Sequence, residues 1–97
     1  MTIEKTISGT ELILKVIGRL DTTTAPQLET EIKELNNVTK LVFDFEELEY
    51  LSSAGLRVIL AAQKTMAKQG EMIVKNVNET INEIFEVTGF IDILTII

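Results

Sequence analysis

The residues of this chain best suited to chemistry are two adjacent serines, Ser52 and Ser53, at the start of a long segment with apolar residues at helical spacing. A serine at a helix start commonly caps the helix by accepting a hydrogen bond from a first-turn amide. With a base beside it, the same hydroxyl can act as a nucleophile. It can also carry a phosphate, because a negative group there meets free N–H groups and the positive end of the helix dipole. The local pattern alone favours the cap.

The composition argues against a self-sufficient nucleophile. The chain contains no histidine and no cysteine, which removes the most common general base, the thiol nucleophile and the most common metal ligands. The serines match neither a Ser-x-x-Lys nor a Gly-x-Ser-x-Gly pattern, and the chain has no glycine loop of the kind that binds nucleotide phosphates. We therefore predict that the protein is not an enzyme and has no catalytic residue, metal or cofactor.

The length and net charge of the chain further restrict the kinds of protein it can be. A chain of 97 residues with 45% hydrophobic residues can bury one core, so we predict a single domain over residues 1–97. Its net charge of −6 should repel nucleic acid and anionic lipid surfaces. The N-terminus lacks a basic leader, and no stretch approaches the roughly 18 apolar residues of a membrane span. We predict a cytoplasmic protein that neither binds nucleic acid directly nor inserts into a membrane.

The elements that must position the serines begin with a hairpin and a helix. Residues 3–8 and 12–17 are β-branched and aliphatic runs on either side of a turn sequence around Gly9, which predicts two antiparallel strands. Thr24 and Gln27 have capping-box spacing, so a helix should begin near Thr24. The apolar residues of this helix recur every three or four positions and predict its inward face. They are Ala25, Leu28, Ile32 and Leu35.

The serine segment lies between two further predicted elements. The apolar run 40–45 is typical of a central strand. An acidic connector over 46–49 should lead from this strand to the serines. The helix that follows them should end near Gly70, which offers a left-handed stop.

The rest of the chain completes an α/β pattern. A strand over 71–75, a helix between Asn78 and Gly89, and a last strand over 93–97 follow from the apolar spacing. The order strand-strand-helix-strand-helix-strand-helix-strand predicts an α/β fold with a mixed sheet and helices packed on it. Function should then reside on the loops at 21–24 and 51–55, where strands end and helices begin.

The segment from Asp44 to Leu60 resembles the signature of STAS domains, in particular the free-standing bacterial anti-sigma factor antagonists. Three shorter segments are similar to other elements of that family. Residues 18–21 resemble its Gly-x-Leu-Asp turn, residues 70–72 its glycine before a strand, and residues 87–90 its Thr-Gly-Phe helix end. The resemblance implies a STAS-like sheet and spans nearly the whole chain.

The resemblance also implies a partner-switching cycle. In this family the unphosphorylated antagonist binds an anti-sigma factor that is also a serine kinase, and so releases the sigma factor. Phosphorylation ends the binding, and a metal-dependent serine phosphatase restores it. Matched on Gly55 and Leu56, the phosphoacceptor falls on Ser53. Ser52 is the second choice because it offers a second hydroxyl directly beside it, at a position where family members often have Asp. We expect the phosphate to act by its charge rather than by remodelling the domain.

The predicted partner-binding residues come from the two loops. They are Asp21, Thr22, Thr23, Ser52, Ser53, Ala54, Gly55, Leu56 and Arg57. Four of them also have a plainer interpretation. Asp21 can simply form a turn, and Thr22 and Thr23 can serve turn or capping chemistry. Arg57 can be a solvated first-turn residue, or it can contact an acidic partner or the phosphate.

Two other functions remain open from the sequence. The chain could be a STAS subunit of another assembly, such as a lipid transport complex or a signalling scaffold, since the same serine loop occurs with other partners. It could also be a small enzyme that uses Ser53 covalently.

Overall fold

The computed structural model describes all of residues 1–97, and the hairpin predicted at the N-terminus is present in it. β1 (Thr2–Ser8) and β2 (Glu11–Leu20) pair antiparallel. The turn between them uses Gly9 at a φ of 62°, a left-handed conformation that glycine adopts without steric penalty. β2 extends three residues beyond the predicted end at Ile17, and this extension carries the chain into the first functional loop.

A mixed sheet forms around β3 (Lys40–Asp44), which is central as predicted. It lies parallel to β2 on one side and to β5 (Glu71–Lys75) on the other. β4 (Leu48–Leu51) lies off this path and pairs in parallel with the far end of β2. The predicted fold class, an α/β fold with a mixed sheet and helices packed on it, is confirmed.

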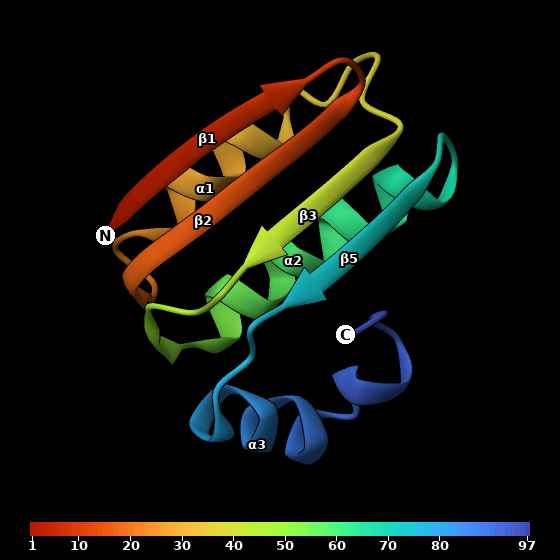
Figure 1. Ribbon diagram of the computed structural model, residues 1–97. Coiled ribbons are helices and arrows are strands. Elements are labelled where there is room, and N and C mark those ends of the chain that lie inside the picture. The colour runs from red at the N-terminus through yellow and green to blue at the C-terminus, as the bar shows by residue number, and fades with distance from the viewer.

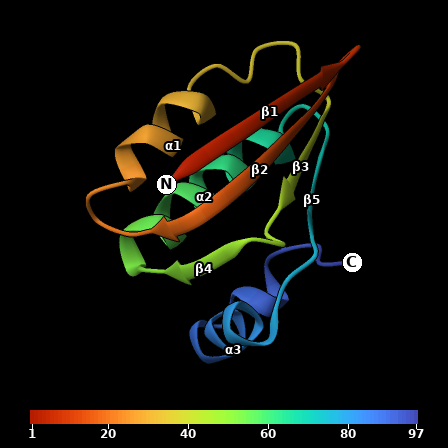
Figure 2. The same ribbon diagram turned by 60° about the vertical axis from the view of Figure 1, so that its left-hand side comes forward.

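The helices cover one face of this sheet. α1 (Ala25–Ile32) and α2 (Ser53–Ala67) lie side by side behind β1, β2, β3 and β5, as the two views in Figures 1 and 2 show. α3 (Glu79–Thr88) lies beyond the end of the sheet and contacts β4. Burial of alternating strand residues follows from this arrangement. The core between sheet and helices contains 23 residues, none of them polar, with Phe43, Phe45 and Phe85 at full burial.

Both ends of α3 lie where the sequence predicts them. Asn78 caps α3 by accepting a hydrogen bond from the N–H of Ile81 at 2.9 Å. Gly89 ends that helix at a φ of 80°, as predicted.

Gly70, in contrast, does not act as a left-handed stop, because α2 ends through Lys68 in a right-handed conformation. A Cβ at Gly70 would overlap the carbonyl of Thr39, so the glycine serves a close backbone approach instead.

The prediction of a connector over residues 46–49 is wrong in part, because β4 begins at Leu48. Leu48 and Leu51 are both buried, and their burial holds the segment extended against the end of β2. A four-residue strand with Glu49 and Tyr50 facing outward carries too short an alternation to be read from the sequence.

The predicted last strand over 93–97 is reduced to a single bridge between Val74 and Ile96. A short 3-10 helix, η1 (Phe90–Asp92), precedes it. Ile93 and Ile97 are exposed and only Leu94 is buried, so this run lacks the partners that would extend it along β5. The fifth strand of the sheet is therefore β4, before α2, rather than a C-terminal strand.

Candidate functional site

The two serines have different structural roles at the start of α2. Ser52 is the N-cap: its Oγ accepts a hydrogen bond from the N–H of Gly55 at 3.3 Å. Its backbone N–H donates to the carbonyl of Leu20 at 2.9 Å, and its carbonyl accepts from Leu56 N–H at 2.9 Å. Ser52 is half-buried. The predicted cap is thus confirmed, and it is Ser52 that supplies it.

Ser53 is the first residue of α2 and is exposed. Its hydroxyl takes part in none of the side-chain hydrogen bonds of the chain, in contrast to that of Ser52. The structure therefore places a free hydroxyl at the helix start, where negative charge is favourable.

Gly55 joins the serine loop to the end of β2. It is buried, and a Cβ at this position would lie 2.7 Å from Leu20 Cγ, 2.8 Å from Leu51 Cδ1 and 3.0 Å from the Leu20 carbonyl oxygen. Real Cβ atoms do not approach so closely, so only glycine allows α2 to start here. Leu56 is also buried, while Ala54 is half-buried. Of the predicted binding residues on α2, Ser53 and Arg57 are the ones exposed to a partner.

The other predicted loop is organised by Asp21. Its Oδ1 accepts hydrogen bonds from the Thr23 hydroxyl at 2.8 Å, from Thr23 N–H at 3.0 Å and from Thr24 N–H at 3.2 Å. The bond from the Thr23 hydroxyl, followed by those from the two backbone N–H groups, lowers the pKa of Asp21 below its ordinary value. Asp21 is therefore a turn-forming residue, and Thr23 is bound to it, while Thr22 is exposed.

The capping box predicted from Thr24 and Gln27 is wrong. Thr24 is the N-cap of α1 by position, but its hydroxyl makes no bond to the helix amides. It accepts from Asp21 N–H at 2.8 Å and donates to the Arg19 carbonyl at 2.8 Å instead. The Thr24 hydroxyl therefore stabilises the loop before α1 and does not cap the helix.

An arginine–tyrosine pair beside the serine loop was missed by the sequence reasoning. Arg19 and Tyr50 are register partners on β2 and β4, and the guanidinium carbon lies 4.3 Å from the ring centroid. Arg19 Nε also lies 3.8 Å from Asp21 Oδ2. Both side chains are exposed. The only signal available was the tyrosine immediately before the serine loop, since the pairing depends on β4.

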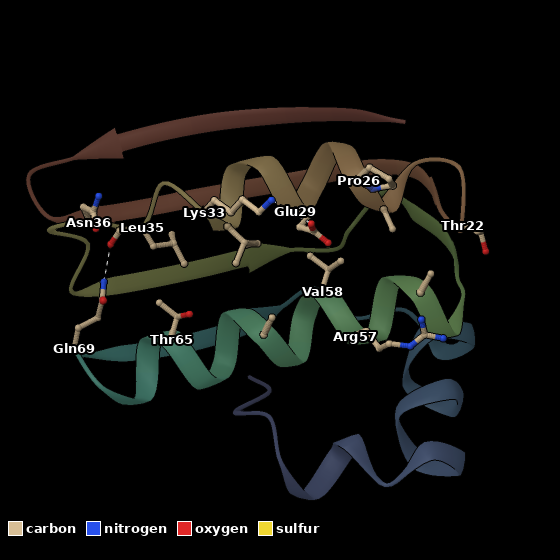
Figure 3. Close-up of a pocket in the computed structure, with 14 residues that line it drawn as sticks. Thr22, Pro26, Glu29, Lys33, Leu35, Asn36, Arg57, Val58, Thr65 and Gln69 are labelled. Carbon is tan, nitrogen blue, oxygen red and sulfur yellow. Dashed lines mark hydrogen bonds and ion pairs between the residues drawn. The ribbon is translucent and has the colours of Figure 1, made fainter.

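A groove of about 610 Å³ runs between α1 and α2 and opens beside the serine loop (Figure 3). Thr22 lies at the same end as Arg57, whose guanidinium extends toward the N-terminal end of α2. At the other end, Gln69 Nε2 donates to the carbonyls of Leu35 at 2.6 Å and Val38 at 2.7 Å. Residues of both predicted loops, Thr22 and Ala54, therefore line the same groove.

None of the helices has the length and apolar character to cross a bilayer.

Comparisons with known proteins agree with this fold. The sequence profile of the STAS domain matches residues 2–97. The chain is 34% identical over 88 residues to BtrV of Bordetella bronchiseptica, covering 88% of this chain and 76% of BtrV. It is 31% identical over 84 residues to the anti-sigma-B factor antagonist of Listeria monocytogenes, covering 84% of this chain and 74% of that protein. Among solved structures, the phosphorylated form of the Bacillus protein SpoIIAA aligns at a TM-score of 0.77 and 20% identity, covering 99% of this chain and 91% of SpoIIAA.

Proposed function

The chain belongs to the STAS domain family and, within it, to the anti-sigma factor antagonists, and from that premise we propose that it is a partner-switching antagonist controlled at Ser53. Unphosphorylated, it binds an anti-sigma factor with serine kinase activity and so frees a sigma factor. The kinase transfers the γ-phosphoryl group of ATP to the Ser53 oxygen, which loses its proton, and the complex separates. A metal-dependent serine phosphatase restores the binding form. We propose that residues 1–97 act as one domain and that the cycle takes place in the cytoplasm.

The observation that carries this proposal is that Ser52 caps α2 while the Ser53 hydroxyl is exposed and makes no hydrogen bond. Ser53 is exposed, and its hydroxyl has no partner to give up. Ser52, in contrast, is half-buried and its Oγ already accepts from Gly55 N–H, so a phosphate there would have to be accommodated at a cap bond that typically contributes about 1 kcal/mol. Phosphorylation of Ser53 leaves that cap in place. SpoIIAA, which shares the fold, has been solved in a phosphorylated form, and this supports a phosphorylated state of the present fold.

The proposed partner surface is formed by what lies exposed around Ser53. It includes Thr22 at the mouth of the groove, Arg57 on α2, and the Arg19–Tyr50 pair. Tyrosine and arginine are enriched among residues that dominate binding energy. Gly55 and Leu56 are buried and support this surface from beneath, while Asp21 and Thr23 hold the shape of the first loop through their hydrogen bonds.

Charge supplies the switch. A phosphate adds about 1.5 to 2 negative charges near neutral pH. An unpaired charge in a desolvated contact costs roughly 2 to 5 kcal/mol, which corresponds to a loss of affinity of about tens- to thousands-fold. This is enough to separate a complex without any change in the domain itself.

The experiment that tests the proposal is intact-mass analysis after incubation with ATP and the candidate kinase partner, followed by site mapping. The wild-type chain should gain one phosphate, located on Ser53. Ser53→Ala should bind the kinase and gain none, while the matched control Ser52→Ala should still be labelled. Labelling that persists in Ser53→Ala would move the acceptor, and an unlabelled wild-type chain that fails to bind an anti-sigma kinase would refute the proposal.

A further inference from the structure

Arg57 lies one helical turn after Ser53 and has no ionic partner within the chain. Residues four apart on a helix are neighbours on its surface. The five ion pairs of the protein use Lys5, Lys15, Arg19, Lys33 and Lys40. Arg57 is exposed, and Figure 3 shows its guanidinium extending toward the end of α2 that carries Ser53. Helical side chains lean toward the N-terminus for reasons of backbone geometry, so this direction is built into the helix.

The position of Arg57 runs against the usual charge pattern of a helix. Carboxylates stabilise the first turn and cations the last, yet the first turn of α2 contains no acidic residue. α3, by comparison, has Glu79 in its first turn. The backbone N–H groups of Ser53 and Ala54 have no acceptor within the chain. In a protein of net charge −6, this end of α2 is locally positive and lacks a counter-charge.

Two acidic side chains of the same part of the molecule have other partners. The Asp21 carboxylate accepts bonds from Thr23 and Thr24 and lies near Arg19. Glu29, which lines the same groove, is paired with Lys33 at 3.4 Å. No carboxylate of the chain lies within ion-pair distance of Arg57.

We propose that Arg57 holds the phosphate of phosphorylated Ser53 by pairing its guanidinium with the phosphate oxygens along the surface of α2. The proposal rests on the proposed function, in that Ser53 is the modified residue. The planar fork of arginine matches two phosphate oxygens at once. Arg57 is thus a positioning residue: it fixes the orientation of the phosphate on the helix, and a phosphatase must displace it to reach the phosphorus atom.

The test uses the full chain with phosphoserine installed at position 53 during translation, so it does not depend on any kinase. The phosphate is titrated by phosphorus NMR in three proteins: the otherwise unchanged chain, Arg57→Gln, and the control Arg19→Gln. A phosphoserine has its second pKa near 6. We expect Arg57→Gln to raise this value by about 0.3 to 1 unit, and Arg19→Gln to leave it unchanged. The difference should shrink in 1 M salt, where the Debye length is about 3 Å.

Rates of dephosphorylation provide a second readout. Hydrolysis by a broad-specificity phosphatase should be several-fold faster in Arg57→Gln than in the unchanged chain, and Arg57→Lys, which keeps the charge without the fork, should be intermediate. Equal titration and equal hydrolysis in the unchanged chain and Arg57→Gln would overturn the inference. So would a larger shift in Arg19→Gln, because the phosphate would then be held by the other loop. Either result leaves the labelling of Ser53 by a kinase unaffected, so the two proposals fail separately.

Discussion

Replacing Ser52 by alanine should destabilise the protein, whereas replacing Ser53 by alanine should not. The Ser52 hydroxyl is the acceptor for Gly55 N–H, and its loss leaves that amide without a partner. Removal of an N-cap costs about 0.5 to 2 kcal/mol. The N···O distance of 3.3 Å is beyond the common range, so we expect the lower half, about 0.5 to 1 kcal/mol. Ser53 loses no bond, and alanine is the better helix former by about 0.5 kcal/mol, so its variant should be equal to the wild type or slightly more stable.

The assay is urea unfolding followed by helical circular dichroism, with thermal unfolding as a second measurement. For a chain of this size, 1 kcal/mol corresponds to about 4 to 8 °C, so the Ser52→Ala midpoint should fall by about 2 to 8 °C. The m-value should be the same in all three proteins, since neither change alters the surface exposed on unfolding. If Ser53→Ala is the more destabilised variant, or if both variants lose the same free energy of unfolding, then the cap is not Ser52 and the argument for a free Ser53 hydroxyl fails.

Three further predictions address the switch, the scaffold and the first loop. Ser53→Asp should weaken kinase binding by about tens- to thousands-fold with unchanged helical circular dichroism; a large loss of that signal would instead indicate remodelling. Gly70→Ala should lower the free energy of unfolding by about 1 to 3 kcal/mol despite its exposed position, because the new Cβ overlaps a backbone carbonyl. Denaturant titration should show no such loss in the exposed control Lys68→Ala, and equal stability of the two variants would contradict the prediction. The lowered pKa of Asp21 contributes stability above its ordinary value of 3.8 that is lost as the pH falls through the lower folded value; Asp21→Asn should therefore flatten the acid limb of a stability–pH curve, and an unchanged slope would contradict this.

Local signals predicted most of the elements and one half of the site. The hairpin around Gly9, the cap at Asn78 and the stop at Gly89 depend on residues within a few positions of one another. The serine segment belongs to the same class, because the cap bond from Gly55 to Ser52 spans three residues. Such interactions form wherever the sequence permits them, so pattern and spacing are sufficient evidence.

Most of the features that could not be predicted depend on segments distant in sequence. β4 is extended because Leu48 and Leu51 find a place against the end of β2, and the Arg19–Tyr50 contact exists only as a result. Gly70 has the sequence context of a helix stop, but the backbone of Thr39 decides its role. For β4 and Gly70, tertiary contact thus overrides the local preference. Thr24 is a local exception: it has capping-box spacing, but its hydroxyl bonds to Asp21 N–H and the Arg19 carbonyl within the loop, and Gln27 N–H donates to the Thr24 carbonyl instead.

The two loops of the site are both held by Leu20 at the end of β2, which favours charge rather than movement as the means of the proposed switching. Ser52 N–H donates to the Leu20 carbonyl at 2.9 Å, and Gly55 packs against the same residue without room for a methyl group. Leu20 is fully buried at the end of β2, so the loop that follows it and the start of α2 form one rigid unit. A phosphate on Ser53 breaks neither contact, because that hydroxyl is bonded to nothing. We therefore expect both forms of the proposed switch to have the same backbone, so that a partner distinguishes them by the added charge.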